Sequence, residues 1–152
     1  NPREYLSMAS MSALETLEKG AKNGFFLMIE SAIIDGYGHN NDSEGMKLEM
    51  YDFNNTLMLL IDYVHNHPNT LLVVTADHET GGTGIAYKHH EVGKKEKVSL
   101  NFSTKGHTGT VVPVFAYGPG AECFAGIMKN TDIPKKLESL MKNDFKTQRS
   151  KL

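Results

Sequence analysis

The chain has 152 residues, which is enough for one compact domain but short for two independent ones. It carries 16 lysine and arginine residues against 18 aspartate and glutamate residues, and the resulting net charge of -2 provides no strongly basic surface for nucleic acid. Its longest apolar runs are far shorter than the roughly 18 residues that span a bilayer, and a single cysteine, Cys123, excludes an internal disulfide.

The beginning of the chain predicts a helix, a buried strand and a loop. Apolar residues three and four positions apart predict a helix over residues 3–22. Residues 25–29 form a continuous apolar run, which is typical of a central strand buried on both faces. Residues 31–43 are rich in Gly, Asn, Asp and Ser, a composition that favours a loop after that strand.

A long helix and a second buried strand follow. The helix is expected to begin at Ser43, as its N-cap, and to end before Pro68. Residues 71–75 repeat the apolar run of a buried strand. The order helix, strand, helix, strand is typical of a parallel sheet in an α/β fold. The predicted apolar face of the long helix consists of Phe53, Leu57, Ile61 and Val64.

The next segment predicts a surface hairpin and a third strong strand. Residues 84–87 and 97–102 are strand candidates, and the basic pair Lys94-Lys95 is the expected turn between them. Residues 111–117 form another apolar strand, which tolerates its proline only at a sheet edge or an irregularity.

Two helices and a tail complete the predicted domain. The helices are expected over residues 121–128 and 133–142, and the charged residues 143–152 are expected to fray. Together the elements predict a single α/β domain, residues 1–152, with a mainly parallel sheet flanked by helices. The two strands with apolar residues on both faces need more neighbours than this chain supplies, so we expect an exposed apolar edge or face.

Carboxylates and imidazoles gather where the predicted strands end. In open α/β sheets, ligands bind beyond the carboxyl ends of the strands. Each of these residues alone has an ordinary structural explanation, such as a cap or a turn, but their repeated placement at strand ends favours a metal site. They are Glu30, Asp35, His39, Asp77, His78 and His107.

The types of ligand atom indicate which ions would bind. Carboxylates combined with imidazoles suit zinc or a similar divalent ion, and a lone further carboxylate suits magnesium. Asp35 and His39 are four residues apart, so a helical turn would let both bind one ion. Gly36 and Gly38 disfavour a regular helix there, although a tight turn would serve equally well.

These residues lie in motifs that resemble the carboxyl-terminal portion of the alkaline phosphatase family. The resemblance runs nearly from end to end, and it implies an incomplete alkaline-phosphatase-like fold. Its motifs, in chain order, are residues 25–30, then Ile34-Asp35 with His39, then residues 73–82, and finally His107-Thr108-Gly109 with residues 114–120.

The resemblance implies a role for each candidate residue. The family hydrolyses phosphate monoesters with zinc and magnesium, and two neighbouring zinc ions stabilise both the attacking and the leaving oxygen of phosphoryl transfer. The implied ligands are Asp35, His39 and His107 for the first zinc, Asp77 and His78 for the second zinc, and Glu30 for magnesium.

The family's nucleophilic serine belongs to its amino-terminal portion, and no residue here matches it. We therefore assign no catalytic nucleophile and expect this chain alone to be inactive. Because the chain starts at Asn1 rather than at methionine, we expect it to be part of a longer protein whose missing amino-terminal part is its partner. By resemblance, the parent would be periplasmic, secreted or surface-anchored, and a homodimer is compatible with it.

Two other functions remain open. Another hydrolase or mutase of the same superfamily, such as a phosphodiesterase, a phosphonate hydrolase or a phosphoglycerate mutase, would share the metal ligands but act on a different substrate. A non-catalytic zinc-binding module belongs to a different class. Structural zinc sites are normally closed cages of four ligands rich in cysteine, and the single cysteine of this chain argues against one.

Overall fold

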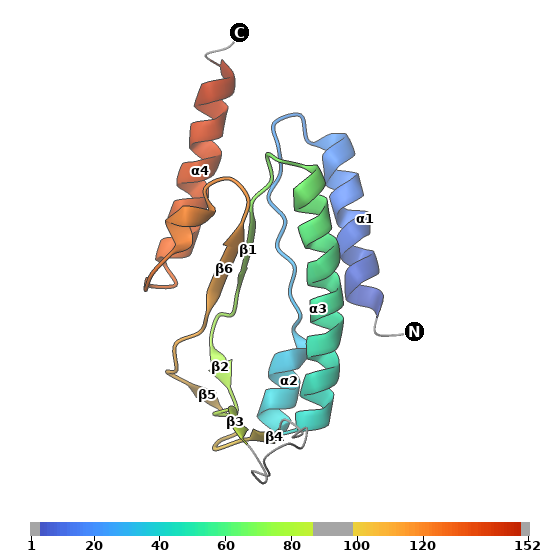
Figure 1. Ribbon diagram of the computed structural model, residues 1–152, viewed down its shortest axis with the longest axis vertical. Coiled ribbons are helices and arrows are strands. Elements are labelled where there is room, and N and C mark those ends of the chain that lie inside the picture. The colour runs from blue at the N-terminus through green and yellow to red at the C-terminus, as the bar shows by residue number, and fades with distance from the viewer. Residues whose placement is uncertain (1–3, 87–98, 150–152) are drawn as a thin grey trace, which may run out of the picture.

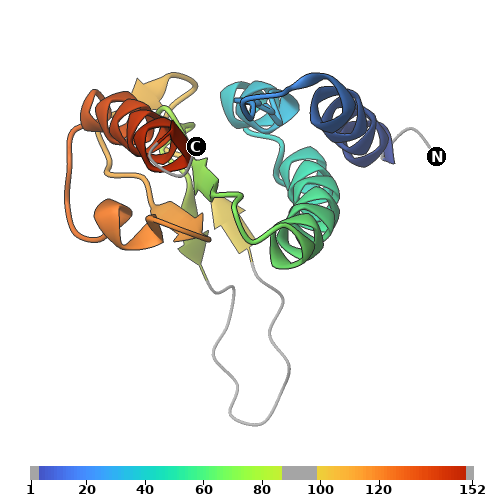
Figure 2. The same cartoon turned by 90° about the horizontal axis from the view of Figure 1, so that it is seen from above.

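The first three helices lie on one side of the molecule, and the strands with the last helix lie on the other (Figure 1, Figure 2). The computed structural model describes residues 4–86 and 99–149. None of the helices in these two stretches is long and apolar enough to cross a membrane. The elements are α1 (Tyr5–Gly20), α2 (Ile33–Asn40), α3 (Ser43–Asn66), β1 (Leu72–Thr75), β2 (Glu79–Thr80), β3 (Gly84–Ala86), β4 (Ser99–Asn101), β5 (His107–Thr108), β6 (Val114–Tyr117), the 3-10 helix η2 (Ala121–Phe124) and α4 (Asp132–Arg149).

Helices α1 and α3 pack against each other and confirm the two long helices predicted from the sequence. Their contact contains a polar pair, because the hydroxyls of Ser7 in α1 and Thr56 in α3 are 2.9 Å apart and buried. The most buried row of α3 lies beside the predicted apolar face and shares only Val64 with it. That buried row is Asp52, Thr56, Leu60 and Val64.

The predicted apolar face of α3 instead borders the strands. Leu57 and Ile61 line an apolar hollow of about 270 Å³ together with residues of β1 and β6. Phe115 of β6 lies at this hollow and is 65% exposed, and Ile61 is 41% exposed. The expected exposed apolar face is therefore confirmed, because α3 covers the β1–β6 pair only in part.

The prediction of a loop over residues 31–43 is wrong, because this segment contains α2. Helix α2 ends at Asn41, whose left-handed backbone (φ 55°) turns the chain towards α3. The next residue, Asp42, is the N-cap of α3 in place of the predicted Ser43, and its carboxylate accepts hydrogen bonds from the backbone of Glu44 and Gly45. A glycine inside a helix lowers its stability by only about 1 kcal/mol. The turn between α2 and α3 and the contacts of α2 with its neighbours offset this cost.

The strands form one antiparallel ribbon with two interruptions. Strand β1 pairs with β6, β2 with β5 and β3 with β4, so residues 72–86 run outward and residues 99–117 run back beside them. The prediction of a mainly parallel sheet is wrong for these pairs, because an apolar run indicates burial and not the direction of the neighbouring strand. The hairpin predicted from residues 84–87 and 97–102 is confirmed by β3 and β4, while its turn lies outside the described residues.

The predicted central strand at residues 25–29 is wrong, because no strand forms there. A strand requires hydrogen bonds to a neighbour, and none of the described strands pairs with this segment. Phe26 and Met28 are 61% and 78% exposed, while Phe25, Leu27 and Ile29 between and beside them are half-buried. One apolar face of this segment is therefore partly buried, and the other is exposed to solvent.

The C-terminal third follows the predicted order with different lengths. The strand predicted over residues 111–117 is confined to β6, and the helix predicted over 121–128 is the single 3-10 turn η2. The last helix, predicted to end near residue 142, continues to Arg149. Residues 143–149 contain neither glycine nor proline, so the sequence there has no strong helix breaker, and charged residues are compatible with a helix.

Candidate metal centre

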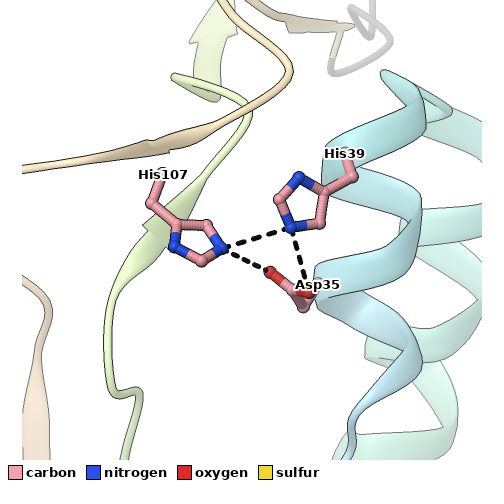
Figure 3. A group of neighbouring side chains, drawn as sticks. All are labelled: Asp35, His39 and His107. Atoms are coloured by element: carbon pink, nitrogen blue, oxygen red, sulfur yellow. Dashed lines mark hydrogen bonds and ion pairs between the residues drawn. The ribbon is translucent and has the colours of Figure 1, made fainter.

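Three predicted ligands meet between α2 and the ribbon (Figure 3). Asp35 and His39 lie one turn apart on the same face of α2, and His107 reaches them from β5. Each residue offers one ligand atom, and these three atoms all lie within 4.8 Å of one another. The structure therefore brings together two segments that are about 70 residues apart in the sequence.

The distances between these atoms fit a tetrahedral metal ion. Zinc bonds of about 2.0–2.1 Å to nitrogen and oxygen place neighbouring ligand atoms of a tetrahedron roughly 3.3–3.4 Å apart. The His39 Nε2 atom lies 3.3 Å from Asp35 Oδ2 and 3.2 Å from His107 Nε2. The His107 Nε2 atom lies 3.6 Å from the other oxygen of this carboxylate, Asp35 Oδ1, which is the oxygen farther from the tetrahedral spacing. The three side chains are between 39% and 48% exposed, so this side of the site is open to solvent.

A second predicted pair lies beside the first group. Asp77 and His78 occupy the interruption between β1 and β2, where no strand partner restricts them. The imidazole of His78 stacks on that of His107 with 3.5 Å between ring centres. His78 Nε2 lies 3.2 Å from Asp77 Oδ2, which again matches the separation of two ligands on one ion. Asp77 is 85% exposed, so this pair is the outer part of the site.

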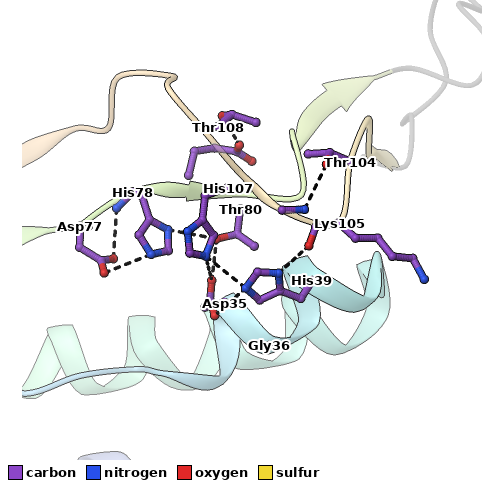
Figure 4. A network of polar contacts seen from close by, with 12 residues as sticks. Asp35, Gly36, His39, Asp77, His78, Thr80, Thr104, Lys105, His107 and Thr108 are labelled. Atoms are coloured by element: carbon purple, nitrogen blue, oxygen red, sulfur yellow. Dashed lines mark hydrogen bonds and ion pairs between the residues drawn. The ribbon is translucent and has the colours of Figure 1, made fainter.

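Backbone contacts orient the imidazole of His39 (Figure 4). Its Nδ1 atom lies 2.6 Å from the carbonyl oxygen of Lys105. A carbonyl can only accept, so Nδ1 carries the proton and neutral His39 has a bare Nε2 directed at the other ligands. Such a hydrogen bond to the far nitrogen is the usual support for a metal-binding histidine.

The Asp35 carboxylate is kept in its charged form. The Thr80 hydroxyl donates to Asp35 Oδ1 over 2.6 Å, and this hydrogen bond is the main reason that the pKa of Asp35 is lowered. The neighbouring His39, His107 and His78 lower the pKa further, while burial acts in the opposite direction. A carboxylate that stays ionised at neutral pH is the form that binds a cation.

Glu79 links strands β2 and β5 on the face of the ribbon opposite to Thr80 and His107. Its carboxylate accepts hydrogen bonds from the Thr108 hydroxyl and from the backbone of Thr83 and Gly82. These contacts lower the pKa of Glu79, and the hydrogen bond from the Thr108 hydroxyl has the largest effect. Glu79 follows His78 and Thr108 follows His107, so the pair joins the two strands directly beside two imidazoles.

Glu30 is the one predicted site residue that stands apart. Its side chain is exposed, and among the described contacts no hydrogen bond or ion pair joins it to the cluster. The magnesium role of Glu30 therefore stays a prediction. Conversely, sequence reasoning missed Thr80 and the carbonyl of Lys105, since a hydroxyl or a backbone oxygen carries no signal in residue spacing.

Comparisons with curated proteins place the chain among phosphatases. A family model described as alkaline phosphatase matches residues 2–99 and 83–143. The chain is 30% identical to alkaline phosphatase 3 of Bacillus subtilis, over 89% of this chain and 44% of that protein. It is also 30% identical to streptomycin-6-phosphate phosphatase of Streptomyces griseus, over 84% of this chain and 33% of that protein. The chain thus spans less than half the length of these relatives.

Solved structures agree with this assignment. The alkaline phosphatase of the Antarctic bacterium TAB5 superimposes with a TM-score of 0.83 at 38% identity, over 91% of this chain and 41% of that chain. A variant of the same enzyme with bound magnesium gives a TM-score of 0.82 at 37% identity, over 91% of this chain and 42% of that chain. The fold is therefore an incomplete alkaline-phosphatase-like fold, and because the family model covers most of the sequence, this chain belongs to the alkaline phosphatase family.

Proposed function

We propose that this chain is the zinc-binding, carboxyl-terminal portion of a phosphomonoesterase. The observation that carries the proposal is the convergence of the ligand atoms of Asp35, His39 and His107 within 4.8 Å, in a chain of the alkaline phosphatase family. These three residues would hold a first zinc ion. Asp77 and His78, stacked beside them through an imidazole, would hold a second.

The arrangement of this chain's own residues supports hydrolysis of phosphate esters. A bound zinc ion supplies a Lewis acid that stabilises negative charge on phosphate oxygens and activates water. The carboxylates and bare imidazole nitrogens would hold the cations, and the Lys105 carbonyl keeps His39 directed at the site. The side chains of the first site are roughly half exposed, so a substrate phosphate would have access to cations bound there. The substrate class that we propose is therefore a phosphate monoester.

Other parts of the catalytic machinery would come from outside this chain. No nucleophile is assigned among its residues, and Glu30 would be one ligand of a magnesium site whose remaining ligands lie elsewhere. The chain matches less than half of its relatives' length, so the proposed partner is the amino-terminal part of the same protein. That part would cover the apolar hollow beside β1 and β6. We further propose a periplasmic, secreted or surface location and leave a homodimer as a testable assembly.

The experiment combines metal analysis with complementation. The chain would be loaded with zinc, dialysed and analysed for metal, and then assayed on p-nitrophenyl phosphate alone and after co-expression with the part of TAB5 alkaline phosphatase that it does not match. We expect zinc retention by the chain alone and hydrolysis only in the co-expressed complex. Hydrolysis by the isolated chain at the rate of the complex would refute the absence of a nucleophile.

Two controls separate the competing functions. His107→Ala should lose zinc, whereas His65→Ala, in the last turn of α3 and away from the site, should retain it. A complex that cleaves bis-p-nitrophenyl phosphate faster than the monoester would favour a phosphodiesterase of the same superfamily. Zinc retention without any hydrolysis in the complex would favour a non-catalytic zinc-binding module.

A further inference from the structure

One hydroxyl stands between the two groups of candidate ligands. Thr80 Oγ1 donates to Asp35 Oδ1 over 2.6 Å and lies 3.2 Å from His78 Nδ1. Asp35 belongs to the proposed first zinc site and His78 to the second. Figure 4 shows Thr80 on the ribbon, directed at both side chains above α2.

The positions of the protons follow from what each atom can donate. The single Thr80 hydrogen is used towards Asp35, so its oxygen can only accept from His78. His78 Nδ1 must then carry a proton, and in the neutral form of His78 this leaves Nε2 bare. That nitrogen lies 3.2 Å from Asp77 Oδ2, so two acceptors face each other at the separation expected for ligands of one cation.

We propose that Thr80 is a positioning residue that couples the two zinc sites through this hydrogen-bonded chain. Its hydroxyl holds Asp35 Oδ1 and so directs the other carboxylate oxygen to the first ion. The same hydroxyl selects the His78 tautomer that presents Nε2 to the second ion. This inference rests on the proposed zinc sites and adds a residue that contacts neither ion.

Close packing fixes the direction of the hydroxyl. A Cβ atom at Gly38 of α2 would lie 3.0 Å from Thr80 Cγ2 and 3.3 Å from Met46 Cε. The Thr80 methyl therefore fills the space that the missing Gly38 side chain leaves. A β-branched side chain held in this way has little rotational freedom, so its oxygen stays between Asp35 and His78.

The chain offers a matched set of variants for the test. Thr80→Val keeps the shape and removes the hydroxyl, whereas Thr80→Ser keeps the hydroxyl. Thr83→Val is the control, because Thr83 lies in the same loop and its hydroxyl donates to the backbone carbonyl of Thr80 rather than to a ligand. Zinc affinities would be measured on the whole chain by competition with a chromophoric chelator.

The expected result is a loss of affinity for both ions in one variant. Thr80→Val should bind each zinc ion about 10- to 100-fold more weakly, the range found when partners of metal ligands are removed. Thr83→Val should stay within about threefold of the unmodified chain, and Thr80→Ser should bind zinc more tightly than Thr80→Val, because both variants keep a hydroxyl at position 80. Equal affinities in Thr80→Val and Thr83→Val would overturn the inference.

A metal-free measurement tests the tautomer itself. Nitrogen-15 NMR of the unmodified chain should show His78 protonated on Nδ1, and Thr80→Val should shift the proton to Nε2, where Asp77 can accept it. A neutral His78 that carries its proton on Nε2 in the unmodified chain would overturn the inference even if Thr80→Val does not fold. If the unmodified chain binds no zinc, the proposed function fails with it; zinc binding that is insensitive to Thr80 refutes this inference alone.

Discussion

The Glu79 carboxylate allows a quantitative test of how the ribbon is held together beside the imidazoles. Glu79→Ala removes the acceptor of the Thr108 hydroxyl, of the Thr83 backbone at 2.6 Å and of the Gly82 backbone at 3.1 Å. A hydrogen bond to a charged group contributes about 1.5–3 kcal/mol when it is well shielded from water, and these groups are only half-buried. Because water replaces part of each contact, we expect the free energy of unfolding to fall by about 2 kcal/mol in total.

The assay is thermal unfolding of the metal-free chain, followed by circular dichroism. For a chain of this length, about 2 kcal/mol corresponds to a fall in Tm of roughly 4–8 °C. Glu44→Ala is the control, since Glu44 is an exposed carboxylate whose described side-chain contact is one pair with Lys47, so its loss should cost less than about 1 kcal/mol. Equal falls in Tm for the two variants would refute the role assigned to Glu79.

Two further measurements test the titration of the carboxylates and the packing of the helices. The folded chain lowers the pKa of Asp35 and Glu79, so these groups stabilise the fold above their unfolded pKa values of about 3.9 and 4.3, and their contribution is lost as the pH falls through the lower folded pKa values. Urea unfolding of the metal-free chain should show a smaller loss of stability between pH 5 and about 3 for Glu79→Gln than for the unmodified chain; an unchanged acid slope would contradict this assignment. Thr56→Val removes the buried hydroxyl that contacts Ser7 and the Asp52 carbonyl, and should lower the free energy of unfolding by about 1–3 kcal/mol in the same urea assay, because Ser7 is left without that partner. A loss no greater than that of the exposed Thr16→Val would contradict the buried pair.

The sequence predicted the two long helices correctly, but it did not predict features that depend on contacts between distant segments. The helical spacing of apolar residues located α1 and α3 correctly, because that pattern depends mainly on the helix itself. The apolar run at residues 25–29 failed as a strand prediction, because strand formation also requires a partner with free hydrogen-bonding groups. The glycines of α2 were misleading for a similar reason: Gly38 is required by the close approach of Thr80, a contact that no local pattern reveals.

The candidate metal ligands could be predicted from the sequence, but the groups that hydrogen-bond to these ligands could not. Asp35 and His39 carry a local signal, since a spacing of four residues places both on one helix face. His107 had to be joined to them through its position near a strand and through the family resemblance, and the structure does bring it there. Thr80 and the Lys105 carbonyl could not be predicted, because their roles arise only when the ribbon lies against α2.

The interruptions in the ribbon determine which changes in length the site can tolerate. Between the β1–β6 and β2–β5 pairs, three residues, 76–78, stand opposite five, 109–113, and the excess is even. Thr80 and His107 are direct partners in the β2–β5 pair, and opposed side chains of an antiparallel pair point to the same face, here the face that meets α2. A deletion in the unpaired residues 109–113 that leaves the β2–β5 pairing unchanged therefore keeps His107 on that face, whereas a one-residue slip of the pairing would turn its imidazole to the opposite face. The register of a two-residue strand, more than the length of the segment beside it, thus determines whether the site can form.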